Sequence, residues 1–231
     1  MNEAVGIVLS CEHASRELPE RLCIPIPDAV LESHRGWDPG AARVGRAVAE
    51  GLGERLHEGR YTRLLVEQNR SLNSEELWSE YSRGLSEEDK RRVLDEVYLP
   101  YRDELESSLK RALGHFERVA HISIHSFTEV WKGERREVDL GILFDPARAF
   151  EVEVAGMLMK GLRERLPGWE IRLNEPYLGT DDGLNHWYRK RFAAERYAGI
   201  EIELKQSLLG DGADWRAASE ALERSIEALQ V

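Results

Sequence analysis

Short apolar segments alternate with segments of helical periodicity along almost the whole chain. This alternation is typical of a three-layer α/β domain, in which helices cover both faces of a mainly parallel or mixed sheet. The predicted strands are residues 5–10, 61–67, 121–127, 138–144, 169–173 and 200–204. The predicted helices are residues 28–33, 41–56, 86–117, 147–166, 184–197 and 214–230, the third broken or bent at Pro100. With no linker or repeat between these elements, residues 1–231 are expected to form a single domain.

Composition excludes several classes of protein. Hydrophobic residues make up 42% and charged residues 32% of the 231, which favours a soluble globular chain. The formal net charge of -11 argues against nucleic acid and anionic membranes as partners. The first residues do not resemble a signal peptide, and Cys11 and Cys23 cannot build a disulfide framework. A cytoplasmic location is therefore expected.

The segment HISIHSF, residues 121–127, predicts a buried strand that carries a polar side chain to a site at its end. On a strand, His121 and His125 lie about 13 Å apart, because each residue advances the chain by about 3.3 Å. One metal ion cannot bind both of them. His125 is the better candidate ligand, because it lies nearer the carboxyl end, where open α/β sheets bind their ligands.

Other candidate ligands lie in loops near predicted strand ends. His13 follows the first strand and can bind a metal as a neutral imidazole, or simply form a hydrogen bond in its loop. An open zinc site with two histidines needs a third ligand, commonly a carboxylate. Glu12, Glu17 and Asp38 are the nearby carboxylates, and spacing alone does not choose among them. Asp38, before Pro39, can also be a helix cap.

Two further polar groups suggest catalysis. Glu201 and Glu203 share one face of a predicted strand, where either can act as a general base, although an exposed edge strand would also explain them. The Asn69-Arg70 pair follows a predicted strand and offers a bidentate grip on a carboxylate, or else a surface ion pair. No serine lies in a GxSxG elbow, which argues against a serine hydrolase. Cys11 next to His13 is a further candidate nucleophile.

Taken together, these segments resemble the N-formylglutamate amidohydrolase family. The similarity extends over about residues 7–209 and rests on VLSCEHASRELP, WDPGAARVGRAVAEGL, NRS, ISIHSFTEV, DLGILFDP, NEPYLG and IEIELKQSLL in that order. The family is similar in turn to zinc carboxypeptidases and aspartoacylases, which implies a phosphorylase/hydrolase-like sheet. Those enzymes carry an early histidine, an Asn-Arg pair, a later histidine and a late glutamate.

The resemblance assigns roles to residues of this chain. It implies a zinc ion, or another divalent ion, bound by His13, Asp38 and His125. Glu203 is preferred to Glu201 as the general base, because Lys205 supplies the basic residue that follows the glutamate of the motif at two positions. Arg70 would grip the substrate or stabilise the oxyanion. The remaining substrate contacts would come from Asn69, Ser126, Tyr177 and Lys205.

The chain departs from the family pattern at three places. Arg16 stands where carboxypeptidases carry a metal-binding glutamate, which is why Asp38 is expected to replace it. Glu67-Gln68 precedes the Asn-Arg pair, where many members have Asp-Pro, and Lys205 stands where arginine is common. These changes affect the expected substrate more than the expected reaction.

The resemblance implies hydrolysis of the amide of an N-acyl amino acid, with N-formylglutamate giving formate and glutamate as the leading case. The same fold acting on another N-acyl amino acid or a small peptide is the first alternative. The second is a non-catalytic domain that binds an acidic metabolite. The sequence gives no indication of the oligomeric state.

Overall fold

The computed structural model describes residues 4–230, so the outermost ends of the predicted domain, 1–3 and 231, lie outside the described residues. Within the described residues, the main sheet has six strands in the order β2-β1-β3-β8-β6-β7. Neighbours from β2 to β8 run parallel, whereas β6 is antiparallel to β8 and parallel to β7. The strands are β1 (Val5–Cys11), β2 (Leu56–Glu58), β3 (Arg118–Phe127), β6 (Leu140–Leu143), β7 (Ile171–Leu173) and β8 (Tyr197–Lys205). The predicted α/β architecture with a mixed, mainly parallel sheet is confirmed.

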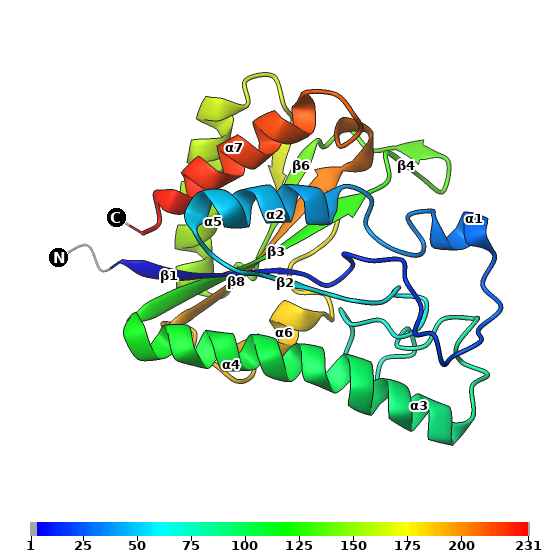
Figure 1. The fold of residues 1–231 in the computed structure, drawn as a ribbon. Helices are drawn as coiled ribbons and strands as arrows, with labels where there is room; N and C mark the ends of the chain where they lie inside the picture. Colours follow the sequence, from blue (N-terminus) through cyan, green and yellow to red (C-terminus); the bar gives the residue numbers. More distant parts are fainter. Residues whose placement is uncertain (1–3, 231) are drawn as a thin grey trace.

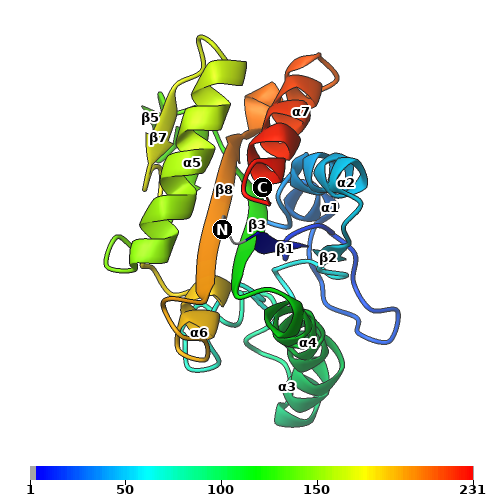
Figure 2. The ribbon, with the colours of Figure 1, turned by 90° about the vertical axis from the view of Figure 1, so that its left-hand side faces the viewer.

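Helices cover both faces of this sheet (Figures 1 and 2). The helices α2 (Ala41–Leu52), α5 (Ala149–Arg165) and α7 (Asp214–Glu227) enclose the larger apolar core on one face. On the other face, α4 (Leu99–His115) and α6 (Leu184–Arg189) pack on a smaller cluster. Alternate residues of β1 serve the two clusters, Ile7 and Leu9 the first and Val8 the second, because successive strand side chains point to opposite faces.

The remaining elements are short or lie at the edges of the domain. They are α1 (Asp28–Leu31), α3 (Glu87–Val93), a π-helical turn (Leu94–Tyr98), a 3₁₀ turn (Gln206–Leu208), and the hairpin of β4 (Val130–Trp131) and β5 (Glu134–Arg135). Ser86 caps α3 by accepting a hydrogen bond from the amide of Asp89. Pro100 lies in the first turn of α4, just after the π-helical turn, so the irregularity expected there is a change of helical winding. None of the helices described is long and apolar enough to cross a membrane.

A third apolar cluster stabilises the connection between β2 and α3, residues 59–86. Leu64, Leu65 and Val66 are buried there against Ile24 and Tyr98. The predicted strand 61–67 is therefore wrong, because this segment forms turns and its apolar run packs on loop and helix side chains outside the sheet. The edge strand is β2, at Leu56–Glu58.

Two predicted helices extend at least four residues beyond the ends of the observed ones. The helix predicted at 41–56 ends at Leu52, because Gly53 adopts a left-handed conformation that terminates it. The helix predicted at 184–197 ends at Arg189, and turns follow before β8 begins. Both differences lie at element ends.

Candidate functional site

Two histidines and an aspartate from separate segments meet at the carboxyl edge of the sheet. His13 follows β1, Asp38 lies in the turn before α2, and His125 lies near the end of β3. Asp38 Oδ2 lies 3.3 Å from His13 Nδ1 and 2.9 Å from His125 Nδ1. All three residues are buried, and one ligand atom from each lies within 4.8 Å of the other two. The group could hold a metal ion.

The turn before α2 directs the Asp38 carboxylate at the histidines. The amide of Asp38 donates to the carbonyl of His13 over 3.0 Å, and the amide of Ser126 donates to Asp38 Oδ2 over 3.3 Å. The chain then enters α2 through Gly40, whose φ of 86° is in the left-handed region that favours glycine. Gly40 is the N-cap of α2, which has no side-chain cap. The alternative interpretation of Asp38 as a helix cap is therefore wrong.

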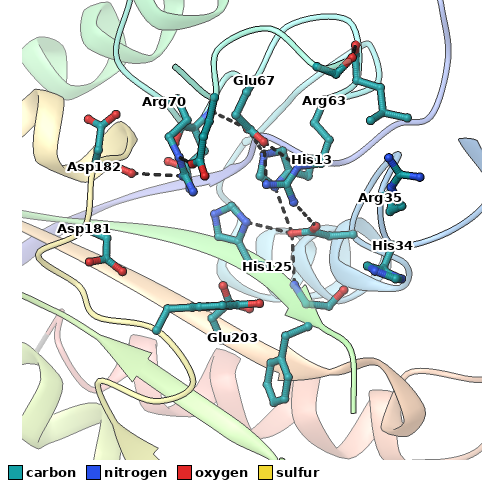
Figure 3. A pocket seen from close by; sticks show the side chains of 18 of the residues that line it. His13, His34, Arg35, Arg63, Glu67, Arg70, His125, Asp181, Asp182 and Glu203 are labelled. Carbon is teal, nitrogen blue, oxygen red and sulfur yellow. Dashed lines mark hydrogen bonds and ion pairs between the residues drawn. The ribbon is translucent and has the colours of Figure 1, made fainter. Parts of the chain in front are cut away.

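Two further buried carboxylates flank the histidines on their Nε2 sides. Glu67 Oε1 lies 2.5 Å from His13 Nε2, and Glu12 Oε2 lies 3.3 Å from His125 Nε2. Arg63 binds Glu67 at 2.6 Å and lies 3.4 Å from Asp38. Figure 3 shows Arg63 and Glu67 on one side of His13, with His125 on the other side.

These contacts fit a divalent cation at the Nδ1 side of both rings. A neutral imidazole has one N–H and one lone pair, so on each ring one of the two flanking carboxylates faces a lone pair. If the Nε2–H groups face Glu67 and Glu12, both Nδ1 lone pairs converge on Asp38, and the repulsion is relieved by a cation between them or by protonation of the rings. Three ionised carboxylates and one guanidinium also leave two negative charges in a buried site. Two nitrogens and an oxygen suit zinc, and they also suit other divalent ions.

Protons on the histidines can also supply the positive charge that the buried carboxylates require. Burial alone would lower the pKa of His125, but Glu12 and Asp38 raise this pKa well above its ordinary value. Burial would raise the pKa of Asp38, yet both histidines hold this pKa well below its usual range. In Glu12, the nearby His125 overcomes the effect of burial and lowers the pKa to about 2. The site therefore favours positive charge between its carboxylates.

Glu203 is the carboxylate next to the His-Asp-His group. It pairs with His125 in the register of β3 and β8. Burial, with smaller contributions from Asp38 and Glu201, raises the pKa of Glu203 to about 8, and its Oε2 has no hydrogen-bond partner among the described residues. Glu201 is two residues further from the end of β8, next to Ser123, and burial raises its pKa as well.

A glycine next to Glu203 lets another segment approach it. Gly141 lies opposite Glu203 in the register of β6 and β8. A Cβ on Gly141 would lie 2.0 Å from the carbonyl oxygen of Glu175 and 3.3 Å from Glu203 Cβ. The NEPY segment, residues 174–177, therefore passes over Gly141, where only glycine leaves room for it.

A cavity of about 560 Å³ opens over these groups. Asn69 and Arg70 line it, together with Tyr177 and the tryptophans Trp78 and Trp131. Arg70 donates to Glu76 over 2.7 Å through Nε, and through Nη1 to the carbonyls of its neighbour Asn69 and of Asp182. Its Nη2 has no hydrogen bond to any described residue, so the N–H groups of this one nitrogen stay available.

Other predicted site residues are placed as follows. Ser126 lines the cavity, but its hydroxyl donates to the carbonyl of Pro39 over 2.9 Å. The Tyr177 hydroxyl accepts from Arg136 over 3.0 Å. Lys205 is not brought into the cavity: its ammonium group pairs with Asp139 at 2.6 Å. Glu17 is exposed, which removes it as a buried third ligand.

Sequence reasoning did not single out Arg63 or assign a role to Glu67. A weak signal for Glu67 existed, because it stands two residues before the Asn-Arg pair, where many family members have an aspartate. A carboxylate is thus retained at that position. No local pattern singles out Arg63, since its role depends on the loop that brings it to Asp38.

Comparisons with known proteins identify the family and the fold of the chain. The family model described as N-formylglutamate amidohydrolase matches residues 5–209. A search among curated protein sequences finds no significant match. Among solved structures, the chain is similar to the gene product Atu2144 from Agrobacterium tumefaciens, with 26% identity, a TM-score of 0.81 and coverage of 99% of this chain and 92% of that one. It also shares the fold of an N-formylglutamate amidohydrolase from Ralstonia eutropha JMP134, with 19% identity, a TM-score of 0.74 and the same coverage.

The match to the family model extends from the first strand to the end of the segment after β8. It therefore includes His13, Asp38, His125 and Glu203, the residues that meet at the edge of the sheet. The resemblance expected from the sequence is confirmed, and the chain belongs to the N-formylglutamate amidohydrolase family.

Proposed function

We propose that the protein is a metal-dependent amidohydrolase, with zinc as the leading metal, that cleaves the amide of an N-acyl amino acid in the cytoplasm. N-formylglutamate, which would give formate and glutamate, is the leading substrate. The observation that carries the proposal is the convergence of His13, Asp38 and His125 beside Glu203 in a cavity lined by Asn69 and Arg70. Family membership supports the reaction class.

His13, Asp38 and His125 would hold the ion through two nitrogens and an oxygen. A zinc ion at such a site supplies a Lewis acid that polarises the acyl oxygen and lowers the pKa of water. Glu203 would take a proton from the attacking water at its free Oε2 and deliver it to the leaving nitrogen. A carboxylate whose pKa is about 8 in the protein alone is suited to exchange protons near neutral pH.

Arg70 would orient the substrate through its free Nη2. Its Nε and Nη1 are already engaged, so the side chain is held in place before substrate arrives, and Nη2 can donate to a substrate carboxylate or to the developing oxyanion. Asn69 supports this geometry, because its carbonyl accepts from Arg70 and its side chain accepts from the amide of Leu184 at the start of α6. Tyr177 would border the same substrate.

The cavity size favours one alternative within the same reaction class. A volume of about 560 Å³ lies within the range of roughly 300–1,000 Å³ that holds drug-sized ligands, and N-formylglutamate is smaller than such ligands. Trp78 and Trp131 add aromatic surface to the lining. A longer N-acyl amino acid or a small peptide would use this surface. Comparing formyl, acetyl and peptidyl derivatives of glutamate and of an aromatic amino acid separates the two possibilities.

The proposed role of Glu203 is tested by Glu203→Gln, which keeps the shape of the side chain but removes its ability to take a proton. Turnover of the best substrate should fall by about 10²–10⁴-fold, and the bound metal should remain. Glu201→Gln makes the same change two residues earlier on the same strand and should cost far less. Turnover like that of the wild type in Glu203→Gln would exclude Glu203 as the base.

A further inference from the structure

The two histidines of the candidate metal site are each flanked by a carboxylate that does not belong to the site. Glu67 faces Nε2 of His13 at 2.5 Å, and Glu12 faces Nε2 of His125 at 3.3 Å. The Nδ1 atoms of both rings face Asp38 instead. The two nitrogens of an imidazole point in diverging directions, so a carboxylate on Nε2 cannot share the ion bound at Nδ1. Glu12 therefore lies behind His125, away from the position of the ion.

We propose that Glu12 and Glu67 are positioning residues of the metal centre, each accepting the Nε2–H of one histidine and so directing the Nδ1 lone pairs of His13 and His125 at one ion. This inference rests on the proposed metal-dependent function and adds the chemistry that selects the tautomer of both ligands. A carboxylate that orients a metal-bound histidine in this way typically changes metal affinity by about 10–100-fold.

The two carboxylates are supported differently. Glu67 accepts hydrogen bonds from Arg63 and, over 3.0 Å, from the amide of Asn69, so its charge is balanced without a metal. Glu12 is fully enclosed and has no arginine or lysine partner among the described residues. Its Oε2 lies at ion-pair distance from the Nε2 of His125, and neither atom has a hydrogen-bond partner among the described residues. Glu12 thus depends more strongly than Glu67 on the histidine it faces.

A buried chain of polar side chains holds the other oxygen of Glu12. Ser10 donates to Glu12 Oε1 over 3.2 Å, and its hydroxyl oxygen lies 2.8 Å from His121 Nε2. Since the single hydroxyl proton of Ser10 goes to the carboxylate, His121 must donate Nε2–H to Ser10, which leaves its Nδ1 to accept from the Tyr197 hydroxyl 3.0 Å away.

At the end of this hydrogen-bond network, Asn185 can be oriented so that Tyr197 donates to His121. The Tyr197 hydroxyl lies 2.9 Å from Asn185 Oδ1, while Asn185 Nδ2 has no partner among the described residues. Turning the Asn185 amide by half a turn brings Nδ2 to the Tyr197 oxygen as a donor, which frees the Tyr197 proton for His121 and leaves Asn185 Oδ1 in the position that Nδ2 held. Every donor in the chain then points toward Glu12, and Glu12 is left with Oε2 for His125.

Glu12→Gln tests the proposal, with zinc affinity measured by chelator competition on the purified full chain. The variant should bind zinc about 10–100-fold more weakly than the wild type. Ser10→Ala, which removes one support of Glu12, should weaken binding in the same direction but less. Glu17→Gln is the matched control, since it makes the same change on an exposed side chain five residues away and should leave the affinity unchanged.

Nitrogen chemical shifts of the histidine rings report the tautomer directly. In the zinc-loaded wild type, His13 and His125 should each show a metal-bound Nδ1 and a protonated Nε2, a measurement that holds even if Glu12→Gln does not fold. The shifts would not follow this pattern if Glu12 and Glu67 only stabilised the fold. Zinc bound through Nε2, or an affinity in folded Glu12→Gln within twofold of the wild type, would overturn the proposal. A wild type that binds no zinc would instead refute the metal-dependent function and this inference with it.

Discussion

The candidate site has a part built on the sheet and a part built on a loop. His125 and Glu203 extend from adjacent parallel strands, where the hydrogen bonds of β3 and β8 set their spacing, and His13 follows the neighbouring strand β1. Arg63, Glu67, Asn69 and Arg70 instead belong to residues 59–86, which have no regular secondary structure. In the proposed function, the sheet would place metal ligands and the proton-transferring group, whereas the loop would supply charge balance and substrate contacts.

The largest expected effect is on the sheet-built part. His125→Ala removes one of two imidazole ligands, so the metal content of the dialysed protein, measured by plasma mass spectrometry, should fall from about one zinc per chain to nearly none. His115→Ala, which changes an exposed histidine at the end of α4, should keep the metal. A fully loaded His125→Ala variant would show that the ion is held elsewhere.

The sequence predicted these two parts with different success, for a physical reason. The run ISIHSF is buried on both faces of a parallel sheet, so its apolar pattern and its position both indicate a strand that ends at a site. The run TRLLVE in the loop is as rich in apolar residues, and its Leu64, Leu65 and Val66 are also buried, but they pack on a separate cluster outside the sheet. An apolar run indicates that its residues are buried. It does not indicate whether they pack within the sheet or against a loop.

The same limit applies to the site residues. His13, Asp38, His125 and Glu203 follow or end strands and helices, or match family motifs, so the sequence could bring them together in one hypothesis. Arg63 has neither kind of signal, and its place depends on the path of the loop. Lys205 was assigned from its spacing to Glu203, but its ammonium group pairs with Asp139, a contact that spacing along one strand does not reveal.

A smaller effect is expected from a substitution that destabilises the loop and leaves the sheet intact. Leu65 is completely buried in the loop cluster, so Leu65→Ala should destabilise that cluster by about 2–5 kcal/mol. Hydrogen exchange of residues 62–77 should accelerate, while β1 and β3 stay protected, because the loop can open as a local unit. Leu72→Ala, at a half-exposed leucine of the same loop, should change little.

The KM and the zinc affinity of Leu65→Ala test the same division between the loop and the sheet. If the loop supplies substrate contacts, KM should rise by a larger factor than zinc affinity falls, since His13, Asp38 and His125 lie outside the loop, although Glu67, which supports His13, belongs to it. Equal acceleration of exchange in β3 would show that the loop and the sheet unfold as one unit, and the division into two parts would then fail.

The smallest expected effect comes from the interior of the sheet and depends on pH. His121 lies four residues before His125 on β3 and is completely buried between Ser10 and Tyr197. Burial is the main cause that lowers its pKa to about 4, with Glu12 opposing and His57 and His125 adding to the shift. An unfolded histidine has a pKa of about 6.5, so between pH 6.5 and 4 the unfolded chain binds a proton that the folded protein refuses.

The free energy of unfolding should therefore fall as the pH drops through this window, by roughly 2 kcal/mol between pH 7 and pH 5 from His121 alone. Urea unfolding of the zinc-loaded protein at both pH values measures the change, and His121→Gln should reduce it by about that amount even if the variant is less stable at pH 7. An undiminished pH dependence in His121→Gln would mean that the loss at low pH arises at the site itself, where protonation of the metal ligands releases the ion. The sheet interior would then be insensitive to acid, and the histidines at its edge would be the groups that limit stability.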